Sequence, residues 1–263
     1  MQAELNGIQL AYDEVGEGPA VLLIHGFPLC RKMWSPQMQA LAAAGFRVVV
    51  PDLRGFGESE PGTEVGSTDL LADDLIALLD NLGIEKTVVG GMSMGGYVML
   101  NLLARYPERF SAACFIVTRA DADDEIAIGK RNHLIAEVEA GRPEAVPTAF
   151  TPLLFADQTI AERSELVDEV RGWMAAASPS GLVVGLEAIR DRSDSSALLP
   201  QLNIPALIMG AQEDKAIPPE KSTGLAEQIP GAKLCMVPAA GHMVNIEQPD
   251  AFNSALLDFL RDN

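Results

Sequence analysis

Residues 87–106 read TVVGGMSMGGYVMLNLLARY, and this stretch determines the fold. It begins with a short valine-rich run, passes through Gly-Met-Ser-Met-Gly, and continues as an apolar helical pattern. A serine at a strand-to-helix corner adopts a strained backbone conformation that needs small neighbours, which Gly91, Gly95 and Gly96 provide. The stretch therefore predicts a buried strand, a sharp turn and a helix, with the Ser93 hydroxyl presented at the carboxyl end of the strand.

Other short apolar runs along the chain are similar to the strand in this stretch. They are continuous rather than alternating, as strands covered on both faces require. Helical patterns separate them, and this order predicts a mainly parallel sheet between layers of helices. The runs are residues 21–25, 47–50, 87–90, 113–117, 206–209 and 234–237.

The ends of the chain complete the expected architecture. Residues 4–13 contain Asn6-Gly7 between two short alternating runs, a strong signal for a β-hairpin that adds antiparallel strands at the sheet's edge. Ser67 to Leu82 and the segment after Pro249 show apolar residues at helical spacing. We expect an α/β fold, with a mostly parallel central sheet of about eight strands flanked by helices.

The alternation of strands and helices lapses in residues 119–200. This segment is mostly helical and polar, and it is inserted between the predicted strands 6 and 7. We interpret it as a helical cap over a core formed by residues 1–118 and 201–263.

Composition and charge exclude several classes of protein. The 263 residues, 48% of them hydrophobic, suit a soluble globular unit. The 37 acidic and 19 basic residues give a formal net charge of −18 at pH 7, the wrong sign for binding a nucleic acid backbone. No apolar stretch reaches the roughly 18 residues of a spanning helix, and the first residues lack the features of a signal peptide. We expect a cytoplasmic protein that binds neither nucleic acid nor membranes, while a homo-oligomer stays open.

The cysteines and histidines form no ligand pattern. The three cysteines are far apart and include no CxxC pair, which indicates neither a disulfide framework nor a zinc site. The three histidines lack a spacing that would bring two ligands to one helix face. The sequence therefore predicts no metal and no cofactor, and packed thiols. The three cysteines are Cys30, Cys114 and Cys235, and the three histidines are His25, His133 and His242.

Several motifs together resemble the α/β-hydrolase fold family. Besides the serine motif, His25-Gly26-Phe27-Pro28 resembles the family's oxyanion loop, and residues 51–59, PDLRGFGES, resemble its structural D-x-R-G-x-G-x-S turn. The resemblance covers nearly the whole chain outside the cap. It implies that the backbone N–H groups of Phe27 and Met94 bind the tetrahedral oxyanion. It also implies that His25 is a structural imidazole that holds the loop.

A serine nucleophile needs a base, and the base needs an orienting carboxylate. Asp214 and His242 follow the last two predicted strands, in the order Ser, Asp, His expected for this fold. Asp121, after the preceding strand, and the adjacent Glu213 are the alternatives for the acid. We predict that Ser93, His242 and Asp214 are the catalytic nucleophile, base and orienting acid.

Three stretches are most similar to serine esterases of the 3-oxoadipate enol-lactonase type and to cofactor-free haloperoxidases or perhydrolases. They are HGFPLCRKMW at 25–34, VTRADADDEIAIGKRNHLI at 117–135 and GHMVNIEQP at 241–249. Serine at position 93 argues against haloalkane dehalogenases and epoxide hydrolases, which place aspartate there. For Arg119, an ion pair with a carboxylate of the cap is the expectation, and contact with a substrate carboxylate is the alternative.

The sequence thus predicts a carboxylic ester hydrolase, lactones included, that acts on small to medium acyl groups through an acyl-enzyme. The alternatives are a carbon–carbon bond hydrolase of ring-cleavage products, a perhydrolase, and a small-molecule-binding protein on the same scaffold. A small-molecule ester is the expected partner. Trp34, Met92 and Trp173 are the candidates for the substrate pocket. The net charge of −18 argues against a strongly anionic substrate.

Overall fold

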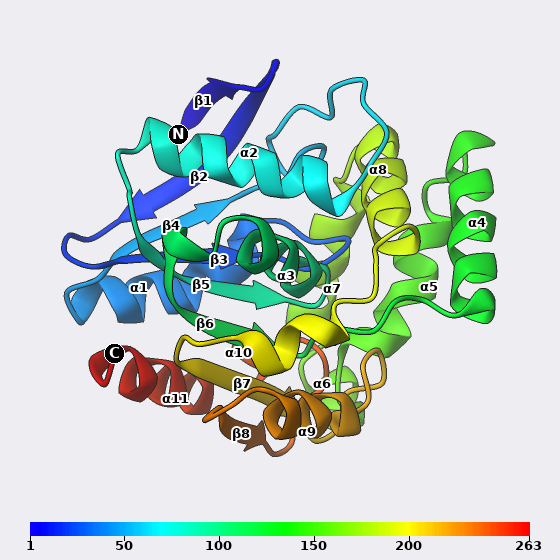
Figure 1. The fold of residues 1–263 in the computed structure, drawn as a ribbon. Coiled ribbons are helices and arrows are strands. Elements are labelled where there is room, and N and C mark those ends of the chain that lie inside the picture. Colours follow the sequence, from blue (N-terminus) through cyan, green and yellow to red (C-terminus); the bar gives the residue numbers. More distant parts are fainter.

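The computed structural model describes residues 1–263 as an eight-stranded sheet with helices on both faces (Figure 1). The strand order is β1-β2-β4-β3-β5-β6-β7-β8, in which β2 is antiparallel to both neighbours and every pair from β4 to β8 is parallel. The predicted α/β fold is confirmed. The strands are β1 (Gln2–Leu5), β2 (Ile8–Val15), β3 (Ala20–Ile24), β4 (Arg47–Pro51), β5 (Thr87–Met92), β6 (Phe110–Ile116), β7 (Ala206–Ala211) and β8 (Lys233–Val237).

The hairpin at the edge forms as its sequence predicts. Asn6 and Gly7 both adopt positive φ, 47° and 76°, the conformation that a two-residue turn between twisted antiparallel strands requires. At the centre of the sheet, every residue of β5 is buried. Because no face of this strand meets water, its sequence is continuously apolar rather than alternating.

Helices cover the two faces of the sheet and create two separate hydrophobic clusters. Helices α1 and α11 pack against each other and contribute to one cluster, while α2, α3 and α9 contribute to the other. The α2 helix begins where the sequence indicates, since the Ser67 hydroxyl accepts a hydrogen bond of 3.1 Å from the Leu70 N–H. The bounds are α1 (Ser35–Ala43), α2 (Thr68–Asn81), α3 (Met94–Arg105), α9 (Pro219–Gln228) and α11 (Pro249–Arg261).

Five α-helices lie between β6 and β7, and they gather beyond the carboxyl ends of the parallel strands, to the right in Figure 1. The first, α4, packs along the last, α8, which contacts the turn after β4. The Ser178 hydroxyl donates a hydrogen bond of 3.1 Å to the Gly55 carbonyl there. The helices are α4 (Glu125–Glu139), α5 (Ala145–Leu154), α6 (Asp157–Glu162), α7 (Ser164–Ala175) and α8 (Pro179–Arg190).

We call α4 to α8 the cap helices. A short helix, α10 (Val244–Glu247), lies between β8 and α11. None of the helices in the structure combines the length and the apolarity that crossing a bilayer would demand.

Candidate active site

Ser93 occupies a strained corner between β5 and α3. Its backbone has φ 53° and ψ −116°, a conformation that costs free energy for any residue with a side chain. Two hydrogen bonds hold this corner: the Ser93 N–H donates to the Ile116 carbonyl at 3.0 Å, and the Thr118 hydroxyl donates to the Ser93 carbonyl at 2.8 Å. Its neighbours are buried, whereas Ser93 itself is half-buried and open to a cavity. The strain therefore places a hydroxyl at the surface of an otherwise closed core.

The glycines around Ser93 are required by close contacts. A Cβ atom at Gly91 would lie 2.4 Å from the Gly95 carbonyl oxygen, and one at Gly95 would lie 2.4 Å from the Ile24 carbonyl oxygen. Both contacts are with backbone atoms, which cannot move aside. The sharp turn from strand to helix therefore depends on these residues.

His242 and Asp214 form a buried hydrogen-bonded pair. The distance between His242 Nδ1 and Asp214 Oδ2 is 2.7 Å. The other carboxylate oxygen, Oδ1, accepts from the backbone N–H groups of Ala216 at 2.8 Å and Ile217 at 2.9 Å. The carboxylate is thus held from both sides, so it fixes the orientation of the imidazole.

Ser93 and His242 both line the same cavity. They come from the ends of different parallel strands, β5 and β8, which meet at one edge of the sheet. The Ser93 hydroxyl forms no hydrogen bond to His242 in this structure; such bonds are often longer in ligand-free enzymes than in complexes.

The alternative acids lie elsewhere. The Asp121 carboxylate is bound by Arg119 Nη1 at 3.1 Å and by Lys221 Nζ at 3.0 Å. The Glu213 side chain is exposed. Of these three acids, only Asp214 is hydrogen-bonded to the imidazole of His242.

His25 is engaged by the backbone on both ring nitrogens. Its Nε2 accepts from the Leu53 N–H at 2.9 Å, and its Nδ1 lies 2.9 Å from the Gly26 carbonyl oxygen. Burial lowers the pKa of His25, which favours a neutral ring with one donor and one acceptor. Because both positions are used, His25 holds the loop after β3 against the turn after β4.

This loop lies directly beside Ser93. A Cβ atom at Gly26 would lie 3.2 Å from the Ser93 Cβ. The next residue, Phe27, lines the same cavity as Ser93, and its backbone N–H donates no hydrogen bond within the protein. Met94 is the first residue of α3, where N–H groups lack an intrahelical acceptor. Two backbone donors are thus available near the Ser93 hydroxyl.

Asp52 ties the turn after β4 to the same loop. Its fully buried carboxylate accepts from the Arg31 N–H at 2.7 Å and from the Glu58 N–H at 2.9 Å, and it pairs with the Arg31 guanidinium. The D-x-R-G-x-G-x-S turn therefore supports the loop and takes no part in the cavity lining.

Glu247 connects the His242 loop to the cap helices. Its Oε1 accepts from the Gly241 N–H at 2.9 Å, and its Oε2 accepts from the Ala156 N–H at 3.0 Å, between α5 and α6. Arg163, from the cap, donates to the Glu247 carbonyl at 2.8 Å. Burial raises the pKa of Glu247. The loop that carries His242 is therefore fixed to the segment that closes the cavity.

The cavity has a volume of about 830 Å³ and lies between the sheet edge and the cap helices. The sheet side contributes Ser93, His242 and Phe27, and α4 and α5 provide most of the opposite wall. Phe27 and Phe150 meet edge to face across it, with ring centroids 5.2 Å apart. The cap residues in the wall are Ile126, Ala127, Gly129, Lys130, Arg131, His133, Leu134, Ala149, Phe150, Leu153, Leu154 and Ile189.

The three candidates for the substrate pocket do not line this cavity. Trp34 is fully buried beside Phe252 of α11, with ring centroids 6.2 Å apart. Met92 is fully buried in the same hydrophobic cluster, on the α1 and α11 face of the sheet, and Trp173 packs half-buried against that cluster. Nearness to Ser93 in sequence does not place Met92 at the cavity, because its side chain leaves β5 toward the core.

Sequence reasoning missed Tyr97 and Phe150, which both line the cavity. Tyr97 lies four residues after Ser93 on α3, one helical turn away, so helical spacing could have identified it. Phe150 carries no local signal, since only the packing of α5 places it opposite Phe27.

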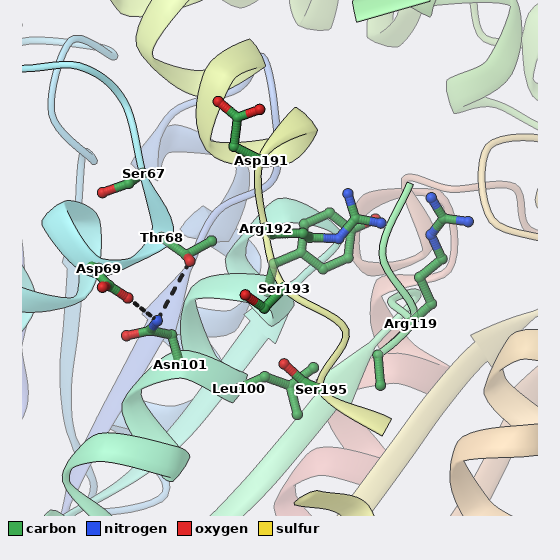
Figure 2. Close-up of a pocket in the computed structure, with 12 residues that line it drawn as sticks. Ser67, Thr68, Asp69, Leu100, Asn101, Arg119, Asp191, Arg192, Ser193 and Ser195 are labelled. Carbon is green, nitrogen blue, oxygen red and sulfur yellow. Dashed lines mark hydrogen bonds between the residues drawn. The ribbon is translucent and has the colours of Figure 1, made fainter. Parts of the chain in front are cut away.

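A smaller cavity of about 170 Å³ adjoins the first, and Tyr97 and Arg119 line both (Figure 2). Its lining is mostly polar, and Asn101 Nδ2 donates there to Thr68 Oγ1 and to Asp69 Oδ1. Figure 2 shows Arg119 on the side opposite these residues. Arg119 binds Asp121 and Asp123, so the expected ion pairs with cap carboxylates are present.

Comparisons with known proteins identify the family of this chain. The profile described as the alpha/beta hydrolase family matches residues 21–255. Because the match spans most of the chain, the protein belongs to the alpha/beta hydrolase family. The resemblance that the motifs indicated is confirmed.

Solved structures of named enzymes superimpose on nearly the whole chain. A thermophilic esterase from Thermogutta terrifontis is 35% identical, with a TM-score of 0.96 over 100% of this chain and 98% of the esterase. The enol-lactonase from Burkholderia xenovorans LB400 is 28% identical, with a TM-score of 0.92 over 99% and 100% of the two chains. A bromoperoxidase from Bacillus anthracis is 29% identical, with a TM-score of 0.87 over 97% and 96%. These similarities support hydrolase activity for this chain.

Proposed function

We propose that the protein hydrolyses carboxylic esters, lactones included, through an acyl-enzyme on Ser93. One observation carries the proposal: the hydrogen-bonded pair His242 and Asp214 opens onto the same cavity as a strained, half-buried serine. A nucleophile, a base and a fixed carboxylate in one cavity are the groups that acyl transfer needs.

In the first step, His242 Nε2 takes the proton of the Ser93 hydroxyl as Oγ attacks the ester carbonyl carbon. The carbonyl oxygen becomes an oxyanion, and the N–H groups of Phe27 and Met94 stabilise it. The protonated His242 then gives its proton to the alcohol oxygen, and the bond between carbonyl carbon and alcohol oxygen breaks. The acyl group stays on Ser93.

In the second step, His242 takes a proton from water, and the hydroxide attacks the acyl carbon. The tetrahedral species collapses, Ser93 Oγ leaves with the proton held by His242, and the carboxylic acid is released. Asp214 holds the Nδ1 proton of the imidazole throughout, which stabilises the imidazolium that forms in each half of the reaction.

The named relatives support an ester-type substrate. An esterase and an enol-lactonase both have nearly the same fold as this chain over its full length. Both reactions break a bond between an acyl carbon and an oxygen, so one triad serves either substrate. Leu153, Leu154 and Phe150 give the cavity an apolar wall for an acyl chain.

The experiment measures hydrolysis of p-nitrophenyl acetate, butyrate and octanoate by the wild type, Ser93→Ala and Ser254→Ala. The Ser254 side chain is exposed on α11 and is not part of the cavity lining, so Ser254→Ala is the matched control. We expect sustained turnover by the wild type and the control, and a loss of about 10⁴-fold or more in kcat/KM for Ser93→Ala.

Three results would contradict the proposal. Equal turnover by Ser93→Ala and the wild type would remove Ser93 from the chemistry. A single stoichiometric burst without turnover would favour ligand binding, and turnover of vinylogous diketones but not of these esters would favour carbon–carbon bond hydrolysis.

A further inference from the structure

The side chain of Phe27 is enclosed, although the residue borders the large cavity. It is only 3% exposed. Its ring meets Phe56 edge to face at 5.8 Å between centroids, and it meets Phe150 at 5.2 Å. On a third side, the ring lies against the backbone of α8 at Gly185, where a Cβ atom would lie 2.6 Å from Phe27 Cδ2. Real Cβ contacts are essentially never this short, so no side chain fits at Gly185 unless something moves.

The backbone of α8 does not itself require a glycine at Gly185. The residue lies inside the helix, and its φ is not positive. Glycine destabilises a helix interior relative to alanine, so the helix alone would favour alanine here. A second ring also crowds this position, since a Cβ atom would lie 2.7 Å from Phe56 Cζ. Packing against the rings of Phe27 and Phe56 is therefore what requires glycine.

Helix α8 is fixed to the core on both sides of Gly185. Before its first residue, the Ser178 hydroxyl donates to the Gly55 carbonyl at 3.1 Å. Two residues after Gly185, the Glu187 carboxylate accepts from the Gly66 N–H at 2.8 Å. A side chain at Gly185 would therefore displace the rings rather than the helix.

Of the two rings, that of Phe27 has room to move. Phe56 is fully buried, whereas Phe27 borders the cavity of about 830 Å³ that Ser93 also lines. A Cβ atom at Gly185 would therefore push the Phe27 ring toward the cavity. Because the ring is attached through Cβ to the Cα atom, this displacement also turns the peptide unit that carries the Phe27 N–H.

This peptide unit is already held at its other end. It is planar, and its carbonyl oxygen belongs to Gly26. That oxygen accepts from the Leu29 N–H at 3.0 Å and lies 2.9 Å from His25 Nδ1. With the oxygen fixed, the direction of the Phe27 N–H depends on the position of the Phe27 Cα, which the packing of the ring determines.

We propose that Gly185 is a positioning residue for the reaction: by leaving room for the Phe27 ring, it keeps the Phe27 N–H directed at the oxyanion. The inference rests on the proposed ester hydrolysis at Ser93, in which this N–H stabilises the oxyanion. Helix α8 then acts on catalysis, whereas the wall formed by α4 and α5 contacts the acyl chain. Loss of one oxyanion donor lowers kcat by about 10²-fold to 10³-fold, and a misdirected donor should cost part of that.

The first experiment compares Gly185→Ala with Gly172→Ala. Both substitutions replace a glycine inside a cap helix, but a Cβ atom at Gly172 has no neighbour within 4 Å. With p-nitrophenyl butyrate, we expect Gly185→Ala to lower kcat about tenfold to a hundredfold and to change KM by less than about twofold. Gly172→Ala should keep the wild-type kcat. Circular dichroism and urea denaturation show whether each variant is folded.

The second experiment measures inhibition by two matched ketones that have the acyl chain of the octanoate ester. With 1,1,1-trifluoro-2-nonanone, Ser93 Oγ adds to the carbonyl carbon, His242 takes the hydroxyl proton, and a tetrahedral oxyanion forms. 2-Nonanone binds without this addition. In Gly185→Ala, the inhibition constant of the fluorinated ketone should rise by about the factor that kcat/KM loses, and that of 2-nonanone should change by less than about twofold. A change in the shape of the cavity alone would weaken both.

A third measurement asks whether the Phe27 ring transmits the effect. Phe27→Leu keeps the backbone N–H but removes the ring, so we expect it to lower kcat about tenfold. In that background, adding Gly185→Ala should lower kcat by less than about twofold, because the two substitutions act on the same contact. Should Gly185→Ala alone fail to fold, the ketone pair is measured on Phe27→Leu: weaker binding of the fluorinated ketone alone supports the proposal, and equal changes for both ketones contradict it.

The outcomes separate this proposal from the proposed function. Equal kcat values for Gly185→Ala and Gly172→Ala would overturn the role of Gly185. Equal losses of affinity for both ketones, or an undiminished effect of Gly185→Ala in the Phe27→Leu background, would overturn it as well. Ester hydrolysis at Ser93 stands in each of these cases. If the wild type releases no more than one equivalent of p-nitrophenol, the proposed function itself fails.

Discussion

The two walls of the large cavity differ in how the protein builds them. On the sheet side, Ser93, Asp214 and His242 each lie within a few residues of a strand end, and backbone hydrogen bonds hold the first two in place. On the cap side, the wall consists of side chains from α4 and α5, whose positions depend on packing between helices. The geometry of the sheet-side wall is therefore set largely by the backbone, and the geometry of the cap-side wall depends on how side chains pack.

From this difference we expect the two walls to have different roles in the reaction. The sheet side can hold a nucleophile and its base to within small tolerances, as chemistry requires. The cap side sets the length, polarity and charge of the space that the acyl chain of the proposed ester would occupy. Changes on the sheet side should therefore lower kcat, and changes on the cap side should alter KM and the choice of ester.

After the loss of Ser93 itself, the largest effect is expected for Asp214→Asn. An amide in place of the carboxylate no longer stabilises the imidazolium and can favour the wrong tautomer of His242, so kcat should fall about 10⁴-fold. Steady-state hydrolysis of p-nitrophenyl butyrate measures this. Glu213→Gln makes the same change of charge at an adjacent, exposed side chain, and comparable losses in both variants would remove Asp214 from the triad.

A smaller effect is expected where the two walls join, at Glu247. Glutamine can accept from only one of the Gly241 and Ala156 N–H groups and presents an NH₂ to the other. We expect Glu247→Gln to lose about 1 to 3 kcal/mol of unfolding free energy and to lower kcat about tenfold. Urea denaturation and steady-state kinetics measure the two effects.

Glu227→Gln is the control, because the substitution removes the same charge and Glu227 is exposed on α9. An unchanged kcat in Glu247→Gln, together with reduced stability, would show that Glu247 stabilises the fold without positioning His242.

The cap wall is tested by Phe150→Ala. Loss of the ring removes apolar contact with the acyl chain, so KM for p-nitrophenyl octanoate should rise about threefold to tenfold with little change in kcat. The acetate ester, which is too short to use this contact, should respond less. Ile160→Ala removes an apolar side chain from a cap helix outside the cavity, and the account fails here if both variants alter KM alike.

The smallest effect is expected for Cys30. Burial raises the pKa of its thiol to about 11, so at pH 8 only about one molecule in a thousand carries the reactive thiolate. The rate of alkylation by iodoacetamide should rise about tenfold per pH unit up to that pKa. At pH 8, the half-buried Cys235 should be labelled first, with activity retained. Rapid labelling of Cys30 with loss of activity would contradict this account.

The same difference between the walls explains how much the sequence could predict. The glycine-rich corner at Ser93, the hairpin turn at Asn6-Gly7 and the helical pattern that starts at Ser67 are local signals, and the structure has each of them. The positions of Asp214 and His242 follow from strand ends, which meet at one edge of a parallel sheet.

The cap wall has no comparable signal. Large apolar side chains predict a pocket at Trp34, Met92 and Trp173, but the same property places Trp34 and Met92 in the core and packs the half-buried Trp173 against it. Phe150 and Lys130 reach the cavity only through the packing of α4 and α5 over the sheet edge. The charged residues of the cavity lining, Arg119, Lys130, Arg131 and Lys215, are all basic, and the net charge of −18 does not predict this.

The most direct test of the account is to trap the acyl-enzyme. The wild type is mixed with p-nitrophenyl butyrate, quenched in acid during the first turnover, digested and examined by mass spectrometry. The account predicts a butyryl group on the peptide that contains Ser93, absent in Ser93→Ala. A butyryl group on another residue, or sustained hydrolysis in which no acyl group is ever found on Ser93, would contradict it.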